Sequence, residues 1–326
     1  MSDVTQPAGA GAMPSRLTDN SQIVLVLLLL ALCIGISLAA SQFYSVENVI
    51  AILRQCSLVL IVGAGMTMLL IAGEVDLSVG ASLAFSGCVA MDVTNKTGSV
   101  FLGALAGILF GGVVGLFNGL VVTRLKVNSL IATIATMMIL QGGVFLYTRE
   151  AVQNKHQQPA FTEISTGYLG PIPLPVIIAA GVFVVAYIVL RFTTIGRYIY
   201  AVGANARAAR LSGKQPESLK LIVFVVTGLL TGLAGLILAS LMNTGQPTAG
   251  RGFELTVIAA VILGGTSLLG GRGTLLGTLL GVLILKVIDN GIIILRWDQN
   301  LQMVVPGVVI VLATYLDLLR RRADAR

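Results

Sequence analysis

The sequence predicts an all-α, polytopic membrane protein with about ten transmembrane helices, some of them broken or re-entrant. Three observations predict this fold class. Of the 326 residues, 56% are hydrophobic and only 11% are charged, the mean hydropathy is +0.94, and long apolar runs alternate with short polar gaps. Charged residues make up roughly 25% of a soluble globular domain, and a spanning helix needs roughly 20 mostly apolar residues. Ten such helices would use most of the chain.

The first apolar run, 23–40, follows a tail over 1–20 that is rich in Pro, Gly, Ala and Ser and is predicted to be disordered and cytoplasmic. Residues 37–39 resemble a signal-peptidase site, but the length of the run and the single preceding Arg16 favour an uncleaved helix. Further spans are predicted near 56–72, 78–94, 99–122, 128–147, 174–190, 219–242, 254–269, 274–295 and 301–319. A single transmembrane domain then covers 21–320, and 321–326 form a basic cytoplasmic tail.

Positively charged side chains orient these spans, because Lys and Arg concentrate on the cytoplasmic side of a membrane. With the amino terminus inside, the 21 Lys and Arg residues divide into 14 on the inner side, six on the outer side and Lys286 within a span. Both termini are therefore predicted to be cytoplasmic. The inner loop that carries Glu74 and Asp76 contains no Lys or Arg of its own.

The sequence offers little support for nucleic-acid binding, metal binding or catalysis. Its basic residues punctuate apolar runs and form no continuous basic face, so nucleic acid is not an expected partner. Cys33, Cys56 and Cys88 lie in apolar segments without a C-x-x-C spacing, and the single histidine, His156, lies in a polar loop. We therefore expect no metal site and no catalytic residue.

Glycines recur every four residues in two of the predicted spans. The two series are Gly103, Gly107, Gly111, Gly115 and Gly119, and then Gly273, Gly277 and Gly281. Small residues at this spacing allow helix backbones to approach closely. A four-residue step overshoots a full helical turn by about 40°. The longer series is therefore expected to wrap around its helix and to contact more than one neighbour.

Two stretches, 63–80 and 245–273, are predicted to be broken helices, because glycines and polar residues interrupt their apolar runs. Unwound backbone is tolerated within a membrane only where it lines a cavity or is buried in protein. We therefore expect a substrate path at these two stretches. Asp76, in the first of them, is either part of that path or a cap on the helix that follows.

The chain shows no energy source of its own. Lys286 and Asp289 lie three residues apart on one helix face and are expected to form a local ion pair, which leaves ion coupling with little support. The phosphate-binding pattern G-x-x-x-x-G-K-[ST] is absent, because Gly213 and Lys214 are followed by Gln215. We therefore expect no cofactor on this chain, and ATP with Mg²⁺ on a partner ATPase.

The inner loop 196–220 is basic and rich in alanine. Its pattern predicts a short helix over 205–211 that ends at Gly213. A short helix between two spans could transmit force from a docked partner. The alternative is a solvated loop that carries the positive charge typical of the inner side.

At these residues the chain resembles a known family, the ribose-type permeases of ATP-binding-cassette importers. The similar stretches are GMTMLLIAGEVDLSVGASLAFSG, GLFNGLVVTRLKVNSLIATIATM, GRYIYAVGANARAARLSG and GQPTAGRGFELTVIAAVILGGTSLLGGRGTLLGTLLGVLIL. The resemblance extends in collinear order from about 23 to 319. It implies a permease in a bacterial inner membrane that pairs with a second permease subunit, as a homodimer or heterodimer. It also implies a cytoplasmic two-domain ATPase and a periplasmic sugar-binding protein as partners.

The resemblance also assigns residues. The family's ATPase-coupling segment falls on Asn205, Ala208, Ala209, Leu211 and Gly213. Its Asp-Leu-Ser-Val-Gly motif falls on 76–80, and its Gly-Gly-Thr-Ser turn falls on 264–267. The chain departs from the family pattern at Ala206, Arg207, Lys214 and Glu74, and in having Thr256 at a position where the family commonly has an acidic residue. The first three departures bear on which ATPase docks, and the last two bear on which sugar is carried.

The expected function is import of a monosaccharide, a ribose-like pentose or related sugar, by alternating access driven by the partner ATPase. The polar side chains expected along the path are Asp76, Ser78, Asn118, Asn128, Gln141, Gln246, Thr266 and Ser267. Hydrogen bonding between helices is the alternative role for such side chains. A branched-chain amino acid permease of the same superfamily and an ion-coupled secondary transporter are the alternative functions.

Overall fold

The computed structural model describes residues 15–324, with side chains described over 22–312 and 314–315. Residues 1–14 and 325–326 of the two predicted tails lie outside the described residues, and the remainder of both tails is helical. In chain order the elements are α1 (Ser15–Ala39), a 3-10 turn η1 (Ser41–Tyr44), α2 (Val46–Ile71), α3 (Val79–Thr97), α4 (Val100–Thr123), α5 (Ser129–Thr148), β1 (Val152–Gln153), α6 (Pro159–Thr166), β2 (Tyr168–Leu169), β3 (Ile172–Pro173), α7 (Leu174–Phe192), α8 (Thr194–Ala204), α9 (Ala206–Leu211), α10 (Pro216–Met242), β4 (Thr244–Gly245), α11 (Phe253–Leu263), α12 (Leu275–Ile294) and α13 (Leu301–Asp324).

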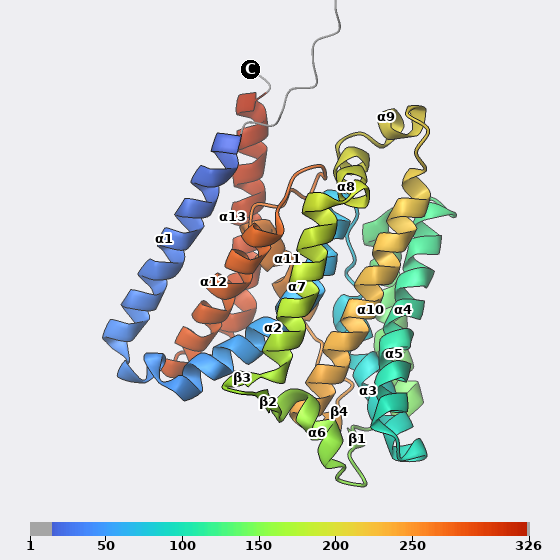
Figure 1. Cartoon of the computed structure of the whole chain (residues 1–326), viewed down its shortest axis with the longest axis vertical. Helices are drawn as coiled ribbons and strands as arrows, with labels where there is room; N and C mark the ends of the chain where they lie inside the picture. Colours follow the sequence, from blue (N-terminus) through green and yellow to red (C-terminus); the bar gives the residue numbers. More distant parts are fainter. Residues whose placement is uncertain (1–14, 325–326) are drawn as a thin grey trace, which may run out of the picture.

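The long helices run side by side between two ends of the molecule (Figure 1). We call one the α9 end, because α8, α9 and the end of α13 lie there, and the other the α6 end, where α6 lies with the short strands. β1 pairs antiparallel with β4, and β2 with β3. Over the described residues these two-residue strands are the only sheet. The predicted all-α membrane fold is confirmed.

Each of the ten predicted apolar runs contains a helix, and over residues 15–324 seven helices are long and apolar enough to cross a membrane, namely α1, α2, α4, α5, α7, α10 and α12. Of the other three, α3 has 19 residues, α13 is apolar over 301–312, and α11 has 11 residues. At a rise of 1.5 Å per residue α11 is about 16 Å long, roughly half the thickness of the hydrocarbon core. The predicted span 254–269 was therefore wrong in length, because the helix stops at Gly264 and Gly265.

α2 occupies the centre of the molecule. Every residue from Cys56 to Ile71 is buried, and the helix contacts α7, α10, α11 and α12. A helix that is apolar on all sides suits such a position. α2 begins at Val46, ten residues before the predicted span, where the Ser45 hydroxyl accepts a hydrogen bond from the Asn48 N–H at 3.2 Å. Polar side chains in these first turns hide the helix from a search for apolar runs.

The glycines of α4 pack against two different helices, as the wrapping of their series predicts. A β-carbon added at Gly107 would lie 2.8 Å from the Ala90 side chain on α3. A β-carbon at Gly111 or Gly115 would instead overlap the backbone of α10 at Gly228 or Phe224. The backbones of α4 and α10 are therefore in direct contact, with glycine required on both sides.

The two longer loops contain structure that the sequence pattern did not predict. The loop 148–173 at the α6 end holds α6 and three of the short strands. The loop at the α9 end holds α8 as well as the predicted α9. α8 begins where the Thr193 hydroxyl accepts a hydrogen bond from the Gly196 N–H at 3.2 Å.

Candidate functional site

The first predicted helix break is present between α2 and α3. We call residues 72–78 the first break. α2 ends at Ile71, and Gly73 turns the chain with φ of +81°, a backbone conformation that glycine adopts without strain. The N–H groups of Gly73 and Glu74 bond back to the last turn of α2, at 3.0 and 2.9 Å. The remaining backbone groups of the break must therefore find partners other than α2.

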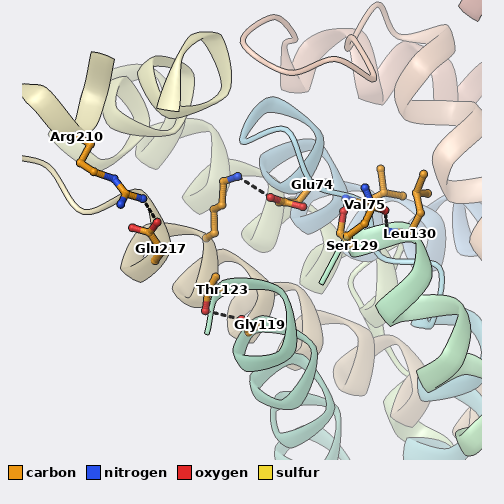
Figure 2. A network of polar contacts seen from close by, with 10 residues as sticks. Glu74, Val75, Gly119, Thr123, Ser129, Leu130, Arg210 and Glu217 are labelled. Atoms are coloured by element: carbon orange, nitrogen blue, oxygen red, sulfur yellow. Dashed lines mark hydrogen bonds and ion pairs between the residues drawn. The ribbon is translucent and has the colours of Figure 1, made fainter. Parts of the chain in front are cut away.

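Side chains of α5 provide two of those partners. The Ser129 hydroxyl accepts the N–H of Val75 at 3.4 Å, and the Thr133 hydroxyl accepts the N–H of Leu77 at 3.1 Å. Figure 2 shows Ser129 beside Val75 and Glu74. These bonds hold part of an unwound segment between helices.

Asp76 lies at the centre of a buried polar cluster on the first break. One carboxylate oxygen accepts the Ser78 N–H at 2.8 Å and the Ser78 hydroxyl at 2.6 Å. The other accepts the Asn118 amide at 3.2 Å, and the same amide donates to the Ser78 hydroxyl at 2.8 Å. All three residues are at most 2% exposed, and the Asn118 side-chain oxygen has no partner among the described residues. The carboxylate thus holds Ser78, the N-cap residue of α3, and among the described residues it accepts no hydrogen bond from an N–H group of α3 itself.

Glu74 forms an ion pair that the sequence did not predict. Its carboxylate lies 2.5 Å from the ammonium of Lys220, in the second turn of α10. The exposed fractions of the two side chains are 11% for Glu74 and 19% for Lys220. The loop around Glu74 has no positive residue of its own. The positive partner of Glu74 comes instead from a helix 146 positions later in the chain.

The second predicted break lies against the first. We call residues 264–274, between α11 and α12, the second break. The N–H of Gly271 donates to the carbonyl oxygen of Ile71 at 2.8 Å, and a β-carbon at Gly270 would lie 3.0 Å from the α-carbon of Gly73. Two breaks nearly 200 residues apart in the chain are therefore joined by backbone contact.

A re-entrant segment, residues 244–252, connects α10 to the half-length α11. A β-carbon at Gly245 would lie 2.7 Å from the α-carbon of Cys88, midway along α3, and one at Gly250 would overlap Gly80 in the first turn of α3. The segment thus follows α3 for about two turns before α11 begins. Only Gly245 and Gly250 of this segment are buried, and these two glycines make its close contacts with α3.

The predicted short helix is present as α9, at the tip of the α9 end (Figure 1). The Asn205 side chain caps it by accepting the N–H of Ala208 at 3.0 Å. Gly213, with φ of +76°, ends it as predicted. Ala209 is buried, whereas Leu211 is 86% exposed. We call residues 194–215 the α8–α9 segment.

α8 connects this segment to both breaks. A β-carbon at Gly203 would overlap the carbonyl oxygen of Ile71 and would lie 2.7 Å from the backbone nitrogen of Gly271. The Tyr200 hydroxyl donates to the carbonyl oxygen of Gly273 at 2.8 Å. The α8–α9 segment, the first break and the second break therefore form one contact region at the α9 end.

Comparison with known proteins identifies the family. The family model described as "Branched-chain amino acid transport system / permease component" matches residues 48–314, which include both breaks and the α8–α9 segment. The chain belongs to this permease family. A ribose import permease protein of Haemophilus influenzae is 39% identical to the permease over 304 residues, 92% of this chain and 93% of the relative. A ribose import permease protein of Escherichia coli is 38% identical over 308 residues, covering 92% and 94%.

An L-arabinose ABC transporter permease protein of Azospirillum brasilense is 38% identical to the permease over 316 residues, 97% of this chain and 92% of the relative. No solved structure matches the permease. Over the described residues, no group of three or more His, Cys, Asp or Glu side chains is placed to hold a metal ion.

The predicted path residues do not all lie together in the permease structure. Asp76, Ser78 and Asn118 meet in the cluster of the first break. Thr266 and Ser267 are buried in the second break, and the Thr266 hydroxyl has no partner among the described residues. Their role in a path stays a prediction.

Gln141 and Gln246 border two small hollows on either side of Ala84. Gln246 donates to the Thr248 hydroxyl at 3.1 Å, and Gln141 is exposed on α5. Asn128 is also exposed and caps α5, because its side-chain oxygen accepts the N–H of Leu130 at 3.0 Å. The structure thus gives Asn128 a helix-capping role.

Proposed function

We propose that this permease is the membrane-spanning subunit of an ATP-driven importer that moves a monosaccharide, a ribose-like pentose or related sugar, across a bacterial inner membrane. The observation that carries the proposal is the naming of the relatives. Proteins 38–39% identical over more than nine-tenths of the chain are named for ribose or L-arabinose. The all-α membrane fold is the architecture such a subunit needs.

The proposal places ATP hydrolysis on a separate cytoplasmic two-domain ATPase, and sugar recognition outside the membrane on a periplasmic binding protein. A second permease subunit completes the path. The α8–α9 segment is the proposed docking site for the ATPase, with Asn205, Ala208, Ala209, Leu211 and Gly213 at the contact. The exposed position of α9 at one end of the molecule supports this role.

Transport by alternating access is proposed to act through the two breaks. They touch each other, and α8 touches the second break and Ile71, the residue immediately before the first break, so a displacement of the α8–α9 segment would reach unwound backbone directly. The α9 end is then cytoplasmic, and both chain termini lie on that side. The excess of Lys and Arg assigned to that side supports this orientation.

The alternatives have weaker support. The family model is described by branched-chain amino acid transport, but the three relatives above are named for sugars. Ion coupling would use charges within the spans, yet Lys286 pairs with Asp289 at 2.8 Å within α12. A pair inside one helix satisfies both charges without an ion.

The proposed function is tested by purifying the tagged permease from its native membrane in mild detergent and identifying co-purifying proteins by mass spectrometry. We expect a two-domain ATPase and a periplasmic protein whose melting temperature rises with ribose or L-arabinose. Competition of uptake by leucine, with no effect of pentoses, would instead support the amino acid alternative. Repeated recovery of the permease alone, under conditions that preserve a known importer, would contradict the proposal.

A further inference from the structure

The Lys220–Glu74 ion pair differs from two other charge pairs in the described residues, Lys286–Asp289 and Arg210–Glu217. It is largely shielded from solvent and joins two separate elements, α10 and the first break. Lys286 and Asp289 are shielded to a similar degree, at 15% and 11% exposure of the side chains, but lie within one helix. The Arg210–Glu217 pair joins α9 to α10 but is 63% and 40% exposed.

The α10 side of the pair is firmly connected to α9. The N–H of Lys214 donates to the carbonyl oxygen of Ala209 at 3.2 Å, and the N–H of Leu219 donates to that of Gln215 at 3.3 Å. Arg210 of α9 pairs with Glu217 in the first turn of α10, as Figure 2 shows. A displacement of α9 therefore displaces the first turns of α10, on which Lys220 lies.

The Glu74 side of the pair lies on backbone that a few individual hydrogen bonds hold in place, rather than the regular ladder of a helix. Between Ile71 and Val79 the chain is not helical, and it is held to α5 by single hydrogen bonds to Ser129 and Thr133. Asp76 follows Glu74 by two residues. Because separating a shielded pair of opposite charges is strongly unfavourable, Glu74 moves with Lys220 rather than away from it.

We infer that the Lys220–Glu74 pair is the contact through which movement of the α8–α9 segment reaches the first break and the Asp76, Ser78 and Asn118 cluster behind it. Lys220 and Glu74 are positioning residues in this inference and touch no substrate. The inference rests on the proposed function, because it assumes that an ATPase moves the α8–α9 segment. It assigns roles to a lysine in α10 and a glutamate that departs from the family pattern.

The test uses the full chain reconstituted in liposomes with its co-purified ATPase and binding protein. Uptake of radiolabelled ribose and L-arabinose and ATP hydrolysis are measured on the same vesicles. In the Glu74→Gln, Lys220→Met double variant, ATPase binding and ATP hydrolysis are expected to persist. The sugar imported per ATP should fall by about 2- to 30-fold, the range to which measured coupling energies correspond.

Two further variants separate transmission from loss of stability. The Asp289→Asn, Lys286→Met double variant neutralises a pair of matched exposure within one helix, and its sugar-to-ATP ratio should equal that of the unmodified permease. The Glu74→Lys, Lys220→Glu variant exchanges the charges and should recover most of the ratio, which a general packing defect would not allow.

An unchanged ratio in the neutralised Glu74 and Lys220 variant would overturn the inference, as would a folded charge-exchange variant no better than the neutral one. An equal fall in the ratio for the Lys286 and Asp289 control would also overturn it. Absence of ATP-dependent uptake by the unmodified permease would contradict the proposed function itself, and the inference would fall with it.

Discussion

At the scale of single residues, Asp76 shows how a carboxylate is accommodated away from water without a cation. Among the described residues no ion pair includes it, and its two oxygens accept three hydrogen bonds from Ser78 and Asn118. Hydrogen bonds to charged groups are stronger than neutral ones. The cluster is therefore sensitive to removal of the one acceptor that all three donors share.

Asp76→Ala leaves the N–H and the hydroxyl of Ser78 without their acceptor in a buried site, and each unsatisfied group costs about 1–3 kcal/mol. The Asn118 amide keeps its hydrogen bond to the Ser78 hydroxyl. We expect a loss of stability of about 2 kcal/mol or more, measured as thermal unfolding of the purified permease in detergent. Asp76→Asn keeps an acceptor for Ser78 and should lose less. Equal melting temperatures for Asp76→Ala and the unmodified permease would contradict this account of the cluster.

At the scale of elements, direct backbone contact between α4 and α10 depends on glycine. A β-carbon at Gly228 would lie 2.9 Å from the backbone of Gly115, and one at Gly232 would lie 2.7 Å from the carbonyl oxygen of Gly107. Neither helix can retreat easily, because α3 and α2 pack against α10 from other sides.

Gly228→Ala is therefore expected to destabilise the permease by about 1–3 kcal/mol, the usual cost of overpacking. Gly181→Ala in α7 is the matched control, since no atom lies within 4 Å of its added β-carbon. It should leave stability unchanged or raise it slightly. Thermal unfolding of the two variants in the same detergent decides the point, and similar destabilisation of both would refute it.

The α9 helix carries a second prediction at this scale. Ala209 is the buried residue of α9, and an aspartate there would place a charge on the packed side of that helix. We expect the Ala209→Asp variant to insert normally in the membrane, and we expect its partner ATPase to hydrolyse ATP without sugar uptake. Normal ATP-driven uptake by this variant would remove the α8–α9 segment from the coupling role.

At the scale of the whole molecule, the assignment of the α9 end to the cytoplasmic side predicts which loops face the cytoplasm. Cys33, Cys56 and Cys88 are half-buried or buried, so a new surface cysteine can be labelled against a low background. Leu211→Cys at the α9 end should react with a membrane-impermeant maleimide only when the inner face is open. Lys155→Cys at the α6 end should react in intact spheroplasts. The reverse pattern would invert the proposed orientation.

Local patterns in the sequence were sufficient for much of this architecture. Ten apolar runs became helices, the glycine series of α4 met two neighbours, and α9 ended at Gly213 as predicted. Both broken stretches were also correct, because glycines and polar residues mark an interruption wherever the helix finally lies. These features depend on residues close together in the chain.

Features that depend on distant residues could not be predicted in this way. Neither Glu74 nor Lys220 carries a local signal of its partner, since their meeting depends on how α10 packs beside the first break. The same holds for the contact of Gly203 with Ile71. The half length of α11 and the early start of α2 were not predicted. Apolar content does not show that a helix is too short to cross the membrane, and it does not detect a first turn made of polar residues.

The central position of α2 has a consequence for biosynthesis. The helices that surround it, α7, α10, α11 and α12, are all synthesised after it. In a nascent chain α2 is therefore exposed to lipid until these helices have been made. The apolar surface of α2 is compatible with that exposure. The Glu74 carboxylate is less compatible with lipid, because its partner Lys220 is synthesised 146 residues later. Chains truncated before α10 should therefore expose an unpaired carboxylate that membrane proteases can recognise.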